Sequence, residues 1–366
     1  MKKTLAAVAV LGAFAASASA DVTVYGRVDV GVNYNADSKV VQMKTGQSSG
    51  NRYGLKGSEK ISEDLTVGFQ LEQGFDVDTG ADKATTGFHR ESRVYVATNY
   101  GTFHFGRMGT LSSGVGSVSV SDDLTVFGTG YAAFSGDMNY LVDGDTRRNN
   151  VVTYQSPVFG GATFWLQAAS DEADGWDHGS SRYYAAAVDY KAGALTAGLV
   201  ASFTDGACTA ASTEGAFVLP EGFELEAGMT LGDALEQAGD AVYTETETAA
   251  KQGEEKTQFI AGVGYDFGVV KAKLTAAYTD YKVANYDMYG VLLGLSAPVA
   301  GGTLDFQYGY ADADTKYERQ SVAAIYQYPL SKQTSLYAGA GWKEEKAANG
   351  AKADEAEYFA GMLHKF

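Results

Sequence analysis

The chain has 366 residues, with 28 Lys and Arg against 45 Asp and Glu, which gives a formal net charge of −17. Nucleic-acid binding begins with a basic surface, so an acidic chain is a poor candidate for it. A single cysteine, Cys208, excludes a framework of intrachain disulfides. The chain has four histidines and no C-x-x-C pair, so the sequence contains no zinc site of the usual spacing. We therefore expect no metal, no cofactor and no nucleic-acid partner.

The first twenty residues have the pattern of a secretory signal peptide. Two lysines precede an apolar run from Leu5 to Ala16, and small residues follow it. Cleavage is expected before Asp21, so that residues 1–20 are removed. A transmembrane anchor is the alternative, but the apolar run is too short and ends at a cleavage site. The mature chain, 21–366, keeps 26 basic and 45 acidic residues, a formal charge of −19.

Composition after the signal peptide favours strands. The chain has 45 Gly, 24 Tyr and 18 Phe, against 4 Pro and 3 Trp. Tyr and Phe favour strands and membrane interfaces, and Gly suits tight turns. No later window approaches twenty uncharged apolar residues, which excludes a membrane helix. If the protein spans a membrane, it must do so as a closed barrel.

Segments of about ten residues alternate apolar and polar side chains along the whole chain. Residues 22–34 set a row of valines against the polar row Tyr25, Arg27, Asp29 and Asn33. Residues 270–278 and 303–310 repeat this pattern with one apolar face and one polar face. Each such segment is predicted to be a strand with one face against water.

The chain ends on an aromatic residue. Termini are usually polar and disordered unless something holds them, so this end is predicted to lie within a strand. One face of that strand carries Tyr358, Ala360, Met362, His364 and Phe366. Phe359 and Leu363 are the only residues that break the alternation.

Short and long connections alternate between these segments, as an outer-membrane barrel requires. Seven short turns are joined by eight long loops, at 35–50, 76–87, 108–147, 171–180, 205–256, 280–287, 312–318 and 344–354. The pattern predicts an all-β fold, a transmembrane antiparallel β-barrel of sixteen strands that encloses an aqueous lumen. A soluble β-sandwich is the alternative. The aromatic clusters near strand ends favour the barrel, because they resemble interfacial girdles.

Two of the long loops differ from the others. The loop 108–147 carries five aspartates and a Gly-rich stretch, and a long ordered loop in a compact domain is usually functional. The loop 205–256 carries twelve acids and two lysines. We expect it to stand in extracellular solvent, with a short helix at 231–239.

Five segments, in this order and spacing, resemble the trimeric general diffusion porins of Gram-negative outer membranes. They are VTVYGRVDVGV at 22, NRYGLKGSEKISEDLTVGFQLEQGF at 51, HRESRVYVATNYGTFHFGR at 89, RRNNVVTYQSPVFGGATF at 147 and the terminal YFAGMLHKF. The resemblance implies a homotrimer in contact with outer-membrane lipid and lipopolysaccharide. It also implies that the last strand closes the barrel and that Phe366 is a signal for the outer-membrane assembly machinery.

The resemblance further implies that the loop 108–147 folds into the barrel and narrows it opposite a ladder of basic side chains. The positions of this chain that match the ladder are Arg27, Arg52, Arg90 and Arg148. Strand parity sets Arg27, Arg52 and the nearby Lys56 on the lumen face, whereas the parity of Arg90 is ambiguous.

The loop departs from the family at one position. The family often has an acid immediately before the Phe-Gly of the loop tip, and this chain has Val126 there. Asp122 and Asp123 are therefore the candidate acids of the constriction. Opposing carboxylates and arginines across a wet lumen would create a transverse field that orients polar solutes.

Passive diffusion of small hydrophilic solutes and ions is the function that the resemblance implies. A substrate-specific channel is the alternative, because an arginine row can serve as a track for an anion, and the exposed acidic loop leaves an adhesin open. No H-E-x-x-H or phosphate-loop motif occurs, so we expect no enzyme and no catalytic residue. The charge of −19 and the two loop acids predict a weak cation preference.

Overall fold

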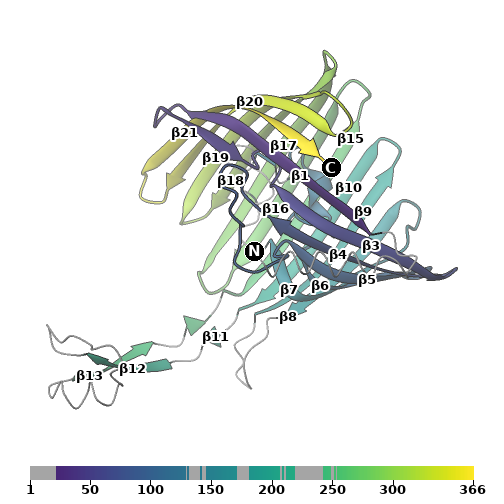
Figure 1. Ribbon diagram of the computed structural model, residues 1–366. Helices are drawn as coiled ribbons and strands as arrows, with labels where there is room; N and C mark the ends of the chain where they lie inside the picture. Colours follow the sequence, from purple (N-terminus) through teal and green to yellow (C-terminus); the bar gives the residue numbers. More distant parts are fainter. Residues whose placement is uncertain are drawn as a thin grey trace.

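The alternating segments build a closed antiparallel β-barrel (Figure 1). The computed structural model describes residues 22–128, 130–131, 141, 146–170, 181–206, 208–209, 212–218, 242–248, 251–252 and 254–366. The predicted signal peptide lies outside the described residues. Within these ranges, no helix is long and apolar enough to cross a membrane.

The prediction of sixteen barrel strands is confirmed. Each strand pairs antiparallel with its neighbours along the chain, and the first pairs with the last to close the ring. The strands are β1 (Thr23–Asn35), β3 (Arg52–Ser62), β4 (Leu65–Gly74), β5 (Glu91–Thr98), β6 (Gly101–Gly109), β7 (Arg147–Gln155), β8 (Ala162–Ser170), β9 (Arg182–Ala192), β10 (Leu195–Asp205), β15 (Lys256–Asp266), β16 (Lys271–Tyr281), β17 (Tyr286–Val299), β18 (Gly302–Ala313), β19 (Tyr317–Pro329), β20 (Thr334–Ala347) and β21 (Lys352–Lys365).

One further strand, β2 (Val40–Thr45), joins the barrel sheet from within the predicted loop 35–50. It pairs with residues 30–35 of β1, whereas β3 pairs only with residues 23–27. Residues 30–35 of β1, which β3 does not reach, therefore pair with β2 instead. The sequence analysis missed this strand, because its polar neighbours hide the short alternation.

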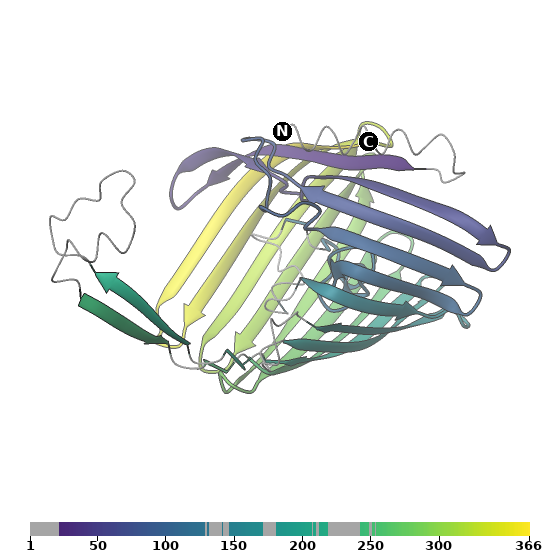
Figure 2. The same ribbon diagram turned by 60° about the horizontal axis from the view of Figure 1, so that its bottom comes forward.

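The loop predicted at 205–256 contains two short ladders in its described part. They pair β11 (Cys208–Thr209) with β14 (Lys251–Gln252), and β12 (Ser212–Val218) with β13 (Val242–Thr248). The ladder of β12 and β13 stands away from the barrel (Figure 2). The helix expected at 231–239 lies outside the described residues.

The barrel inverts the burial pattern of a soluble protein. In β18, Leu304 and Phe306 are 42% and 36% exposed, whereas Asp305 and Gln307 are 5% and 0% exposed. A soluble β-sandwich would bury the apolar face against a second sheet. The sandwich alternative is therefore wrong, since one closed sheet carries its apolar side chains on the outside.

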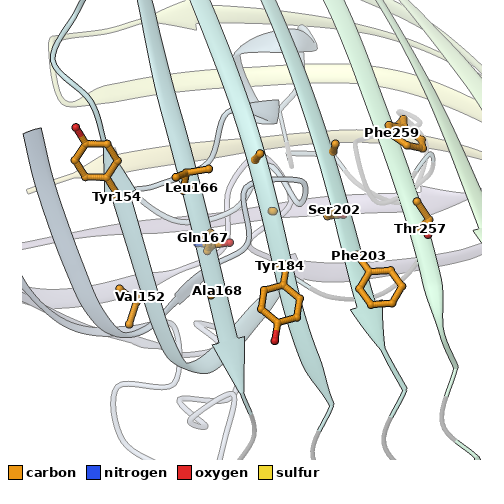
Figure 3. A pocket seen from close by; sticks show the side chains of 13 residues that line it. Val152, Tyr154, Leu166, Gln167, Ala168, Tyr184, Ser202, Phe203, Thr257 and Phe259 are labelled. Carbon is orange, nitrogen blue, oxygen red and sulfur yellow. The ribbon is translucent and has the colours of Figure 1, made fainter.

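The outer wall is a continuous apolar surface. Leu166, Tyr184, Phe203 and Phe259 project from one face of β8, β9, β10 and β15, around a shallow cavity of about 580 Å³ (Figure 3). Small side chains such as Ala186 form the floor of this cavity. The surface is suited to contact with lipid chains rather than with water.

Backbone hydrogen bonds at the terminal residue complete the ring. The Phe366 N–H donates to the Gly26 carbonyl at 3.1 Å, and the Gly26 N–H donates to the Phe366 carbonyl at 3.0 Å. A side chain at Gly26 would overlap the Phe366 ring and the Arg52 carbonyl. The close approach of the two termini therefore requires glycine at position 26.

Replacing Gly26 by Val should impair closure of the barrel. The added side chain would cost about 1–3 kcal/mol through overpacking against the last strand. We expect a lower yield of folded barrel, measured as the fraction that keeps its folded mobility on an unheated gel. Gly87→Ala is the control, because a side chain at Gly87 meets open space. Equal yields of both variants would contradict this role of Gly26.

Candidate functional site

The segment between β6 and β7 contacts the inner faces of distant strands. After Gly109 the Leu111 N–H donates to the Gln167 side chain at 3.0 Å, and the chain then reaches the 3₁₀ turn η1 (Ser121–Leu124). Leu124 is 3% exposed and packs where Gly198 of β10 and Gly262 of β15 lack side chains. These glycines let the turn lie directly on the wall.

The same segment then contacts the wall farther around the ring, at β20 and β21. The Tyr131 ring lies 5.5 Å from the Tyr337 ring and 5.6 Å from the Phe359 ring, and Phe127 packs beside them. The Tyr131 N–H donates to the Gln47 carbonyl at 2.8 Å. Phe359 broke the predicted alternation because it is an inward ring that packs against this segment.

Three arginines gather around one buried carboxylate. Glu72 of β4 accepts from Arg90 Nε at 2.7 Å and lies 3.4 Å from Arg52 Nη1. Ser49 Oγ accepts from Arg27 at 2.6 Å and from Arg52 at 3.1 Å. The three guanidinium groups are thereby held in place, and Glu72 compensates only part of their charge.

These arginines line a polar cavity of about 450 Å³ inside the barrel. Arg27, Arg52 and Arg90 form one side, and Asp122 and Lys273 belong to the same lining. The structure therefore brings together three of the predicted basic residues and one of the two predicted acids. The parity of Arg90 was ambiguous because it lies just before β5, where the strand alternation has not begun.

Two of the predicted basic residues lie elsewhere among the described residues. Arg148 is 7% exposed, stacks over the Tyr183 ring at 5.2 Å and donates to Ser181 Oγ at 3.1 Å. Lys56 faces the same side as Arg52 but lies over the Tyr25 ring at 5.2 Å. Neither belongs to the described lining of the cavity.

Asp123 is bound to the wall rather than turned to the cavity. Its carboxylate forms an ion pair with Lys191 of β9. Lys273 of β16 donates to the backbone carbonyls of Asp123 and Thr125, each at 2.7 Å. Lys191, Lys273 and Glu72 were not predicted as site residues, although the alternation of β16 sets Lys273 on its polar face.

Val126 occupies the position where the family often has an acid. Its N–H contacts Gln307 Oε1 at 3.4 Å. A Cβ added at Gly294 of β17 would lie 2.8 Å from both methyl groups of Val126. The valine thus packs against a glycine of the wall, where a carboxylate would be desolvated.

Among the described residues of this segment, Asp122 is the carboxylate that lines the cavity. It lies on η1, outside the strands. Desolvation inside the barrel, followed by the charge of Asp123, raises the pKa of the Asp122 carboxyl above its ordinary value. Lys273 and Arg27 act in the opposite direction without reversing the shift.

Metal ligation finds no support in the ranges that the structure describes. There, no three His, Cys, Asp or Glu side chains are grouped so that they could hold a metal ion. The chemistry of the site is that of fixed charges in a wet cavity.

Comparison with known proteins gives consistent matches over nearly the whole chain. The family model described as "Gram-negative porin" matches residues 6–219 and 196–348. An outer membrane porin protein of Bordetella pertussis is 28% identical, with 100% of both chains covered. Outer membrane porin protein 32 of Delftia acidovorans is 29% identical, with 95% of this chain and 91% of the relative covered.

Solved structures share the fold. The anion-selective porin from Comamonas acidovorans superposes with a TM-score of 0.70 at 23% identity, covering 95% of this chain and 100% of that chain. The outer membrane protein OmpT of Vibrio cholerae gives a TM-score of 0.62 at 15% identity, covering 96% of this chain and 98% of that chain.

Lowering the pH should make the cavity more positive through Asp122. Because its pKa is raised, this carboxyl takes up a proton while ordinary carboxyls remain ionised. The preference for anions over cations should therefore rise as the pH is lowered. The measurement is the reversal potential in a salt gradient as a function of pH. Asp122→Asn should lack this titration, and an identical pH profile in the variant would contradict the assignment.

Proposed function

We propose that this chain, which belongs to the Gram-negative porin family, passes small hydrophilic solutes and ions by passive diffusion through a constriction formed by the segment after β6. The protein is a multi-pass β-barrel of the outer membrane. Its family and fold are those of channels rather than of enzymes. Our proposal concerns the position of the constriction and its selectivity for charge.

The observation that carries the proposal is the series of contacts that one segment makes along the inner wall. Leu124 lies against β10 and β15, and Tyr131 lies against β20 and β21. Between these points Lys273 of β16 and Gly294 of β17 also contact the segment, so it follows the inner wall and occupies the lumen on that side. Solutes must then pass beside it, through the polar cavity that Asp122 and the arginines line.

The charges across this cavity create a transverse field. Arg27 and Arg52 lie on the wall of β1 and β3, and Asp122 belongs to the segment after β6. Fixed charges with little room to reorganise orient a dipolar solute and disfavour an apolar one. The field therefore selects hydrophilic solutes without a specific binding site.

Two contributions decide the charge preference. The net charge of −19 predicts a weak cation preference, but charges on distant loops are screened beyond about 8 Å at physiological salt. Among the described residues, the lining carries Arg27, Arg52, Arg90 and Lys273 against Asp122, and basic groups remain in excess when Glu72, bound to Arg52 and Arg90, is counted. Because a passing ion meets these groups directly, we favour a weak anion preference over the weak cation preference.

Removing one lining arginine should shift this preference toward cations. We expect Arg52→Gln to change the ratio of anion to cation permeability by a factor of about two, because the site is partly screened by water. Arg148→Gln is the matched control, since it removes the same charge away from the described lining. Reversal potentials in planar bilayers measure both. An equal shift in the two variants would mean that the cavity does not set the selectivity.

A substrate-specific channel is the alternative function. Glu72 forms ion pairs with Arg52 and Arg90. These arginines are therefore less able to bind a passing anion, which argues against a substrate-specific channel. Liposome swelling with neutral sugars of increasing size separates the two. We expect uptake that falls smoothly with size and does not saturate with concentration. Saturable uptake of one sugar or anion would favour the substrate-specific channel.

Assembly follows the same family pattern in our proposal. The protein would form a homotrimer, with its outer wall in contact with outer-membrane lipid and lipopolysaccharide. The outer-membrane assembly machinery would recognise the terminal strand through Phe366, whose side chain is 50% exposed on the outside of the closed ring. An exposed terminal ring beside a closing hydrogen-bond pair is suited to that role.

A further inference from the structure

We infer that Lys273 and Thr275 of β16 are positioning residues that fix the constriction segment against the wall. This inference rests on the proposed diffusion function, and it concerns what keeps the aperture constant. Neither residue belonged to the predicted site, and Thr275 does not line the cavity among the described residues.

Three successive backbone carbonyls of the segment are held by this one strand. Lys273 Nζ donates to the carbonyls of Asp123 and Thr125, each at 2.7 Å. Thr275 Oγ1 donates to the Leu124 carbonyl at 2.6 Å. Two side chains on the same face of β16 thus bind every carbonyl from residue 123 to residue 125.

The position of these carbonyls explains why they require donors. They come at and just after the end of η1, where the last carbonyls of a helical turn have no partner within the turn. Leu124 and Thr125 are each 3% exposed, and Thr275 is fully buried. Because water has little access to the carbonyls of Leu124 and Thr125, loss of their donors leaves them buried and unpaired.

The neighbouring ion pair cannot replace these bonds. The side chains of Lys191 and Asp123 are 56% and 61% exposed, and exposed pairs contribute little. The side chain of Leu124 packs on the glycines of β10 and β15 through nonpolar contacts alone. The polar contacts to β16 therefore decide the position of the turn, and with it the position of Asp122 in the cavity.

The chain offers a matched control on the same strand. Lys271 lies two residues before Lys273 and therefore on the same face. It pairs with Asp266 at 3.2 Å and does not belong to the described lining. Lys271→Met is the same substitution as Lys273→Met and removes the same charge. It leaves the hydrogen bonds between Lys273 and the turn intact.

Single-channel recording of the folded, full-length protein tests the inference. Loss of two bonds to a charged donor should shift the equilibrium between attached and detached turn by about tenfold or more. We expect Lys273→Met to show increased open-channel noise and brief changes in conductance. Lys271→Met should be as quiet as the wild type, and Lys273→Arg should largely restore the quiet state, because a guanidinium also donates to carbonyls.

Thr275→Val keeps the shape of the side chain and removes a single donor, so its noise should lie between wild type and Lys273→Met. If Lys273→Met does not keep its folded mobility on an unheated gel, Thr275→Val alone tests the inference. Quiet recordings from Lys273→Met, or from Thr275→Val in that case, would overturn the inference while the channel function stands. A folded wild type that passes no current would instead overturn the proposed function.

Discussion

A backbone that crosses lipid without helices must satisfy every N–H and C=O in a closed sheet, and this constraint determines the rest of the molecule. The ring depends on the pairing of β1 with β21, which runs from Arg27 and Lys365 to Asn35 and Glu357. Once the ring is closed, one face of every strand meets lipid and the other meets the lumen. The acidic, glycine-rich and tyrosine-rich composition is a consequence of that division.

The lumen of such a ring is too wide for wall side chains to fill. The segment after β6 occupies part of it, and glycines of the wall make room where it touches. Leu124 lies over Gly198 and Gly262, and Val126 lies against Gly294. Charged groups then remain on the water-filled side, where Glu72 holds two of the arginines and Asp122 faces the same cavity.

The fold was largely predictable, because the period of two in a strand is visible in any stretch of ten residues. The site was predictable only where a strand or a family motif fixed the residue, as for Arg27 and Arg52. Lys191 and Lys273 were not found, since their role depends on a turn that reaches them from β6. Phe359 interrupts the alternation of its strand, because its ring packs against Tyr131, which lies far away in the sequence.

The central claim is that the η1 turn lies in the path of the current. The most direct test places a cysteine at Asp122, in a chain whose own Cys208 is replaced by Ser, and labels it with a bulky thiol reagent during single-channel recording. We expect labelling to lower the current by about half or more, since the added group occupies the cavity beside the arginines. A cysteine at Gly87, which faces open space, should leave the current unchanged when labelled. Complete labelling at position 122 with no change in current would contradict the account.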